Sequence, residues 1–230
     1  MPIAAHLRRL ALAAALGGLA TVASGISASA HPHVWVTAKA ELVYADGKVA
    51  GVRHVWSFDP EYTTWVTQGL DANKDGRLTP DELQGLAATN TENLAEFGYF
   101  TKLKVGGKEQ AFAEPREPAM RMEGQALTLS FLLPLKTPAA QGRGVAALEV
   151  YDPTFFVSFA MAEGPEAATL AGAPPGCVAT LTRPKTEQPK IADAKTVGDK
   201  PGMTEAFFEA LTAASTYGVQ FASRVLVACP

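Results

Sequence analysis

The chain has few of the residue types that act as nucleophiles or bind soft metals. Its 230 residues include only two cysteines and four histidines. It contains no acyl-transfer elbow, no zinc-protease helix motif, no phosphate-binding loop and no closely spaced redox cysteine pair. These absences exclude the corresponding enzyme signatures, and we do not expect the protein to be an enzyme.

An excess of basic residues is also missing. The chain has 20 Lys and Arg against 23 Asp and Glu, for a net charge of −3. Two of the basic residues, Arg8 and Arg9, belong to an N-terminal leader without acidic residues, so the remainder carries −5. Such mild acidity argues against nucleic acid or anionic lipid as a partner and suits cations.

Long apolar runs are confined to the N-terminus. Leu10–Ala20 follows the two arginines, and Ala28-Ser29-Ala30 supplies a small-residue cleavage site. Glycine and serine in the second half of the segment favour a cleaved signal peptide, residues 1–30, over a retained membrane anchor. No later stretch is long and apolar enough to span a bilayer. We therefore expect a periplasmic or secreted domain formed by residues 31–230.

Both cysteines, Cys177 and Cys229, lie in the exported part, where the compartment is oxidising. An even pair in such a compartment is typical of a disulfide, which here would close a long loop and hold the C-terminal strand. The alternative, two thiolate metal ligands, lacks any closely spaced Cys or His partner. We predict the disulfide.

Alternating apolar and polar residues predict strands over most of the exported part. Val34 to Leu42 alternates, Asp46-Gly47 is a typical hairpin turn, and Lys48–Phe58 returns as the second strand. A polar loop is expected at 183–202 and a short amphipathic helix at 204–215. The pattern predicts an α+β fold, with an antiparallel β-sandwich or curled sheet in one domain and helices inserted after the first hairpin. Further strands are expected at 101–105, 125–135, 145–151, 155–160, 177–182 and 223–229.

The most specific motif is the segment 71–82, Asp-Ala-Asn-Lys-Asp-Gly-Arg-Leu-Thr-Pro-Asp-Glu. It fits the calcium loop of an EF-hand, in which alternate oxygen donors surround a hard cation and a glycine, here Gly76, makes the sharp turn. The expected ligands are the side chains of Asp71, Asn73, Asp75 and Glu82 and the backbone carbonyl of Arg77.

Other interpretations of this segment are open. Asp, Asn and Gly are ordinary turn residues, and Thr79-Pro-Asp-Glu82 is also a helix capping box, which is compatible with an EF-hand because its exit helix starts near this point. Apolar residues recur at helical intervals on both sides, so we expect an EF-hand-like insertion at about 59–98, opened by Asp59-Pro60. A lone loop of this kind binds calcium weakly, at about 10⁻⁴ to 10⁻³ M.

Cleavage after Ala30 would place His31-Pro32-His33 at the new N-terminus. Imidazole binds Zn, Cu, Ni and Co, and the freed α-amine adds a nitrogen donor. Pro32 has no N–H and so excludes the square-planar amino-terminal mode of Cu(II) and Ni(II). His31 and His33 are therefore candidate transition-metal ligands. The alternative is that both are exposed polar residues at a fraying terminus.

The third exported histidine, His54, is a weaker candidate. Tight pairing from the hairpin turn places it opposite Lys39, too far along the strand to share a site with His33, so we expect a structural role. The same register brings His31 and His33 near Asp59 and Glu61, and a carboxylate there could add an oxygen ligand. Asp59 is more typical of a helix N-cap.

Several segments together resemble a bacterial family of periplasmic proteins of unknown function. They are His31-Pro-His-Val-Trp35, Trp56-Ser-Phe-Asp59, Phe97-Gly-Tyr-Phe100, Tyr151-Asp-Pro-Thr-Phe-Phe156 and Phe221-Ala-Ser-Arg-Val-Leu-Val-Ala-Cys229. The family is labelled as the periplasmic or substrate-binding component of an uncharacterised ABC-type transport system, and its members occur near nickel, cobalt or zinc transport proteins. By position, the resemblance assigns the histidine motif to His31 and His33, and an acidic turn to Asp152. The calcium loop is present in only some members.

Three functions are consistent with these features. The first, which we favour, is a periplasmic metal-binding protein, accessory to an inner-membrane metal transporter, with Ca²⁺ in the loop and Ni²⁺, Co²⁺, Zn²⁺ or Cu²⁺ at the two histidines. The second is a calcium-stabilised interaction module without a transition metal. The third is a copper enzyme with a histidine brace, which rests only on the leading histidine.

Overall fold

The computed structural model of the chain describes residues 32–186 and 217–230. The predicted leader, His31, most of the polar loop 183–202 and the helix 204–215 lie outside these residues. The described residues belong to one compact unit, His31–Pro230. Within the described ranges, no helix is both long and apolar enough to cross a bilayer.

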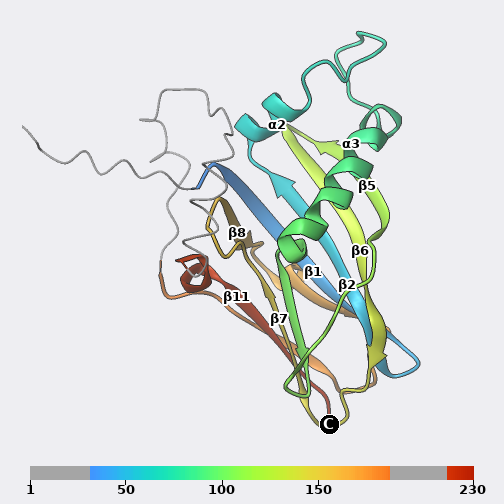
Figure 1. The fold of residues 1–230 in the computed structure, drawn as a ribbon, viewed down its shortest axis with the longest axis vertical. Helices are drawn as coiled ribbons and strands as arrows, with labels where there is room; N and C mark the ends of the chain where they lie inside the picture. Colours follow the sequence, from blue (N-terminus) through green and yellow to red (C-terminus); the bar gives the residue numbers. More distant parts are fainter. Residues whose placement is uncertain (1–31, 187–216) are drawn as a thin grey trace, which may run out of the picture. The chain divides into compact units, whose positions relative to one another are not determined.

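Two open β-sheets form the body of the domain (Figure 1). Sheet A has the strand order β5-β6-β2-β1-β8, with β9 also paired to β1, and sheet B has the order β10-β11-β7-β3-β4. Sheet A contains β1 (Val34–Ala45), β2 (Lys48–Phe58), β5 (Arg116–Glu123), β6 (Ala126–Ala139), β8 (Val157–Met161) and β9 (Ala168–Ala171). Sheet B contains β3 (Thr101–Val105), β4 (Lys108–Glu109), β7 (Val145–Val150), β10 (Val178–Thr182) and β11 (Ser223–Ala228).

The α+β class is confirmed, but the expectation of purely antiparallel sheets is wrong. Strand β1 pairs in parallel with both β8 and β9. Parallel neighbours need a long connection, and the chain supplies one by passing through sheet B between β2 and β8. The sequence also gave no clear signal for β5, because this edge strand contains Pro118 and several charged residues, as edge strands commonly do.

Two helices separated by a loop follow the first hairpin, as expected. Helix α2 (Pro60–Val66) is short, and helix α3 (Pro80–Asn93) continues into the 3-10 segment η1 (Leu94–Phe100). Figure 1 shows α2 and the following loop at one end of the two sheets, and α3 packs alongside β5. Two more 3-10 turns, η2 (Pro165–Ala167) and η4 (Tyr217–Phe221), precede β9 and β11.

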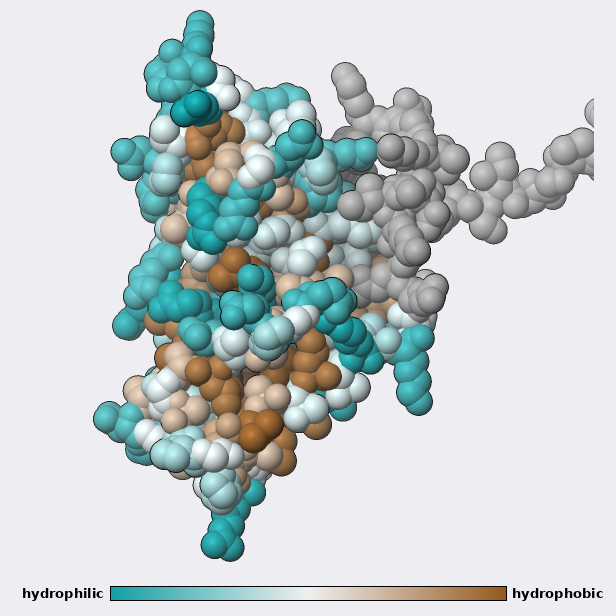
Figure 2. All heavy atoms as spheres, turned by 180° about the vertical axis from the view of Figure 1, so that it is seen from behind, coloured by the Kyte–Doolittle hydropathy of each residue, from teal (hydrophilic) through white to brown (hydrophobic). Residues whose placement is uncertain are grey.

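The core lies between the sheets, because one apolar face is buried on each of the strands β1, β2, β3, β6, β7 and β11. On β2, Trp56 is 1% exposed and faces the buried Phe131 of β6, with ring centroids 5.0 Å apart. Helix α3 adds Leu83 and Ala87, both fully buried. Burying large side chains in this way is the main favourable term in folding. Figure 2 shows one outer face, on which both tips are hydrophilic and apolar side chains gather mainly in the half away from the loop.

The register of the first hairpin differs from the expected one. The turn at Asp46-Gly47 is confirmed, with positive φ at both residues. A bulge then inserts one extra residue, since Tyr44 pairs with Val49 but Val43 pairs with Gly51. As a result His54 lies opposite Ala40 and not opposite Lys39.

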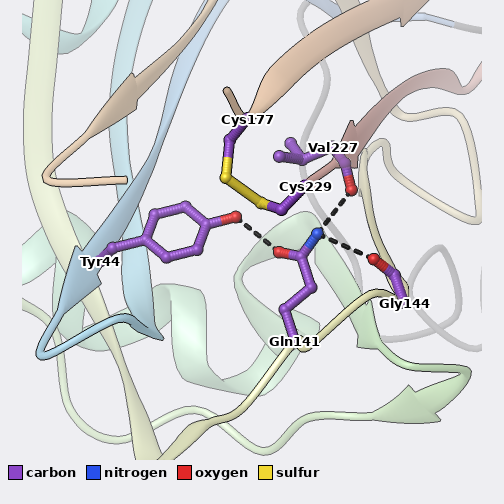
Figure 3. The surroundings of a disulfide bond; sticks show 6 residues. All are labelled: Tyr44, Gln141, Gly144, Cys177, Val227 and Cys229. Atoms are coloured by element: carbon purple, nitrogen blue, oxygen red, sulfur yellow. Dashed lines mark hydrogen bonds between the residues drawn. A yellow bond between two sulfur atoms is a disulfide. The ribbon is translucent and has the colours of Figure 1, made fainter. Parts of the chain in front are cut away.

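The predicted disulfide between Cys177 and Cys229 is confirmed. It joins the residue before β10 to the end of β11 (Figure 3). Beside it, the buried Gln141 accepts a 2.6 Å hydrogen bond from the Tyr44 hydroxyl and donates one of 2.8 Å to the carbonyl of Val227. The disulfide is consistent with an oxidising compartment outside the cytoplasm.

Candidate functional site

The loop 71–82 connects α2 to α3 and is exposed along most of its length. Gly76 has φ of +79° and Lys74 has φ of +59°. Glycine adopts this left-handed conformation without a steric penalty, so Gly76 allows the sharp reversal that the sequence motif requires. The backbone turn of the predicted calcium loop is therefore present.

Side-chain oxygens in the first half of the loop accept hydrogen bonds from amides a few residues later. Asp71 Oδ1 accepts from Asp75 N at 3.2 Å, and Asp71 Oδ2 accepts from Gly76 N at 2.9 Å. Asn73 Oδ1 also accepts from Asp75 N, at 2.9 Å, and Asp75 Oδ1 accepts from Arg77 N at 2.8 Å. These bonds turn the three side chains back toward the loop.

Glu82 links the two ends of the loop. Its Oε1 accepts from the amide of Ala72 at 3.0 Å, and its Oε2 accepts from the amide and the hydroxyl of Thr79, both at 2.9 Å. The capping box that the sequence predicted is therefore confirmed, with Thr79 as the N-cap of α3. The hydrogen bonds from Thr79 are the largest cause of a lowered pKa of Glu82, so this carboxylate stays ionised below its usual range.

The loop carboxylates are held by amides and not by one another. Within residues 32–186 and 217–230, no group of three or more His, Cys, Asp or Glu side chains forms a metal-binding cluster. Each carboxylate oxygen that accepts one hydrogen bond still has lone-pair capacity for a cation. The structure thus places Asp71, Asn73, Asp75 and Glu82 in one loop, and calcium binding by them stays a prediction, as does the role of the Arg77 carbonyl.

Only one of the two candidate transition-metal histidines can be placed, because His31 lies outside the described residues. His33 is half-buried just before β1. Its amide donates a 2.9 Å hydrogen bond to the carbonyl of Phe156, and its ring lies 5.0 Å from the Phe156 ring. The imidazole of His33 is therefore positioned beside the turn that leads into β8.

Asp59, which the sequence also placed near His33, has a structural role. Asp59 is 6% exposed and is the N-cap of α2, since its Oδ1 accepts from Tyr62 N at 2.8 Å. Its Oδ2 accepts from the amide of Trp35 at 2.9 Å. The carboxylate thus fixes the start of α2 to β1, and the predicted N-cap is confirmed. The bond to Trp35 had no signal in the sequence.

The acidic turn of the family resemblance is also a structural turn. Asp152 is 5% exposed. Its Oδ1 accepts from the amide and hydroxyl of Thr154, both at 2.8 Å, and its Oδ2 accepts from Val157 N at 2.9 Å. The expected turn before Pro153 is confirmed. The same turn carries Phe156, which contacts His33.

The segments that carry the family resemblance contact one another in the fold. Besides the His33–Phe156 contact, the amide of Tyr151 donates to the carbonyl of Phe100 at 2.9 Å. The ring of Phe155 stacks on that of Phe221 with centroids 3.9 Å apart. Sequence stretches about 50 or more residues apart therefore form one connected set of contacts around the ends of β1, β7 and β11.

His54 is structural, as expected. It is fully buried, and burial lowers its pKa from the usual 6.5 to about 3. Its ring stacks on Phe131 at 5.0 Å and meets the edge of Trp56 at 5.3 Å. Its Nε2 lies 3.2 Å from the hydroxyl oxygen of Thr101. The partner Thr101 is 47 residues away, so the sequence did not reveal this bond.

Comparisons with known proteins support a shared family and give no function. A family described as a protein of unknown function (DUF1007) matches residues 16–229. An uncharacterised protein of Haemophilus influenzae is 23% identical over 202 residues, 87% of this chain and 91% of that protein. An uncharacterised 15.5 kDa protein from the trpE 3′ region of Spirochaeta aurantia is 30% identical over 121 residues, 50% of this chain and 81% of that protein. No solved structure matches the chain.

Proposed function

The chain belongs to the DUF1007 family of proteins of unknown function, and we propose that it is an exported metal-binding protein whose loop 71–82 binds calcium. The observation that carries the proposal is the orientation of the oxygen-bearing side chains. Hydrogen bonds from the loop amides hold Asp71, Asn73 and Asp75 in a sharp turn at Gly76. Glu82 reaches back from α3 to the amide of Ala72, at the start of the same loop.

This arrangement suits a hard cation. Calcium takes six to eight oxygens at about 2.3–2.6 Å. The four side chains and the carbonyl of Arg77 supply most of these oxygens, and water supplies the rest. Glu82 bridges the ends of the loop through its bonds to Ala72 and Thr79, and its carboxylate would turn from these bonds to the cation. The position of the loop at the surface gives the cation free access.

A second metal site at the N-terminus is part of the proposal. His31 and His33, with the amine that signal cleavage would free, offer nitrogen donors for Ni²⁺, Co²⁺, Zn²⁺ or Cu²⁺. The resemblance to a family labelled as part of an ABC-type transport system supports a role beside an inner-membrane metal transporter. His33 is half-buried next to Phe156, which favours a ligand role over the alternative of an exposed residue at a fraying terminus.

One observation favours the alternative of a calcium-stabilised interaction module. The two helices that flank the loop are each attached to sheet A, through separate contacts. Helix α2 is held through Asp59 and through Thr63, whose hydroxyl accepts from Leu127 N at 3.1 Å. Helix α3 is held through the buried Leu83 and Ala87. An ion between two attached helices would stabilise the domain without a large movement.

Calorimetry and thermal unfolding of the processed protein test calcium binding. Calcium at tenfold its Kd is expected to stabilise the wild type by about 1.4 kcal/mol. Glu82→Gln should lose this effect because it removes the carboxylate that reaches from α3 back to the amide of Ala72. Glu92→Gln is the matched control, since Glu92 is an exposed acid on α3 outside the loop. Absence of heat and of any shift in Tm at millimolar calcium would refute the calcium site.

The N-terminal site is tested separately with Ni²⁺, Co²⁺, Zn²⁺ and Cu²⁺. We expect affinity to fall at least tenfold in His33→Ala, and also when one extra residue precedes His31. Glu82→Gln should leave this affinity unchanged. Equal affinity in all four proteins would leave the calcium-stabilised module as the better function.

A further inference from the structure

The turn Gly98–Phe100, at the end of η1 and directly before β3, has an unusual backbone. Gly98, Tyr99 and Phe100 all have positive φ, at 57°, 57° and 48°. Residues other than glycine rarely adopt this left-handed backbone conformation, and two of them in succession, Tyr99 and Phe100, make the turn strained. Strain of this kind persists only where the surrounding contacts hold it in place.

Thr101 connects this turn to the buried His54. The Thr101 hydroxyl donates a 2.7 Å hydrogen bond to the carbonyl of Tyr99. Because its proton is used there, the oxygen of Thr101 accepts from His54 Nε2, at 3.2 Å. His54 is therefore the neutral tautomer with its proton on Nε2. Two backbone hydrogen bonds also hold the turn: the amide of Thr101 donates to the carbonyl of Gly98, and the amide of Tyr151 donates to the carbonyl of Phe100.

The other imidazole nitrogen faces an apolar environment. Among the described residues, His54 Nδ1 and Trp56 Nε1 are buried without a hydrogen-bond partner. The groups around the ring are Trp56 on β2, Phe131 on β6 and Thr101 on β3, and the residue opposite on β1 is Ala40. None of them is charged, and burial is the sole cause of the lowered pKa of His54.

We propose that His54 is an acid-sensitive latch that holds the strained Gly98–Phe100 turn closed while it is neutral and releases the turn when it takes up a proton. A protonated ring would place a charge and an unpaired Nδ1–H in the apolar core. The cost falls when water reaches the ring and solvates the charge. The Gly98–Phe100 turn is the part that opens, because its strained backbone favours opening and because Thr101 connects it to the His54 ring.

Release would change the surface of the protein. Phe100 lies against Trp56 and Phe159 in the core, with ring centroids 6.4 and 5.3 Å away. On its other side it stacks on Phe97, which is 45% exposed. Opening the turn would withdraw Phe100 from the core and expose a pair of aromatic rings. Acid outside the cell would thus expose an apolar surface that is covered at neutral pH.

Native-state hydrogen exchange of the full processed protein, followed by NMR and corrected for intrinsic rates, tests the latch. Between pH 6 and pH 4 the opened state takes up a proton that the closed state does not. The opening constant for the amides of Thr101–Leu103 should therefore rise about tenfold per pH unit. In His54→Gln, whose amide can still donate to Thr101, this slope should vanish. His33→Gln is the control and should keep the wild-type slope.

A second variant covers the case in which His54→Gln does not fold. Thr101→Val removes the link while leaving the ring, so exchange in the turn should be raised at least tenfold already at pH 7. The latch is contradicted if the wild-type slope is below about twofold per pH unit, or if His54→Gln keeps it. It is also contradicted if the amides of Thr101–Leu103 open with the same free energy as the slowest-exchanging core amides at every pH, because the turn would then open only through global unfolding.

Discussion

The loop 71–82 and the core of the β-sandwich satisfy their polar groups in opposite ways. In the loop, the oxygens of Asp71, Asn73 and Asp75 accept from amides two to five residues later in the chain. In the core, His54 bonds Thr101, and Thr63 bonds Leu127. The loop therefore depends on its own residues, whereas the polar groups of the core depend on the assembled sheets.

This difference predicts that the two regions respond separately to mutation. Damage to the long-range links should lower global stability and leave the loop able to bind its ion. Damage to the loop should change ion binding and leave the sheets intact. The following experiments test this separation, from the largest expected effect to the smallest.

Removing the disulfide should have the largest effect. The bond between Cys177 and Cys229 closes a loop of 52 residues, so the double change to Ser is expected to lower the free energy of unfolding by about 4 kcal/mol. Urea unfolding measures this loss. Calcium affinity of the folded fraction should be unchanged within twofold. A parallel loss of calcium affinity would show that the loop depends on the sheets after all.

Asp59→Ala should be the next most destabilising change. It leaves the amides of Trp35 and Tyr62 without their partner in a buried position, at an expected cost of about 3 kcal/mol in urea unfolding. Asp81→Ala is the matched control, because Asp81 is an exposed acid in the first turn of α3 and should cost only about 0.5 kcal/mol. Equal effects would mean that Asp59 contributes no more than an exposed acid in the first turn of a helix.

The smallest expected effect is the pH dependence of stability, which differs between Glu82 in the loop and His54 in the core. The lowered pKa of Glu82 means that its capping interactions stabilise the protein above the usual pKa of 4.5 and are lost as pH falls through the folded value. The stability difference between wild type and Glu82→Gln should thus be constant from pH 7 to 5 and disappear below. His54 acts in a higher window, with stability falling from pH 6.5 downward. A Glu82-dependent change above pH 5.5 would contradict this assignment.

Much of the fold could be predicted because its signals are local. The Asp46-Gly47 turn, the Asp59 N-cap, the Thr79–Glu82 capping box and the sharp turn at Gly76 all depend on residues within a few positions of one another. The disulfide could be predicted because the chain has only two cysteines. In each case few alternatives compete with the correct interaction.

The parts that could not be predicted depend on distant residues. One extra residue on β2, in the bulge between Val49 and Gly51, changed the partner of His54 from Lys39 to Ala40. Strand β5 was missed because an edge strand can be polar on one face and still pair with β6. The bond between Asp59 and Trp35 exists only because β1 and β2 pair to their ends.

By itself, the amino-acid sequence determined the candidate calcium loop, the helix caps and the strand pattern, because these arise from interactions between near neighbours in the chain. Only the tertiary structure decided which strands are parallel, that Asp59 ties α2 to β1, and that His54 lies uncharged beneath a strained turn. Those features require partners that the sequence separates by tens of residues, and packing of the two sheets brings them together.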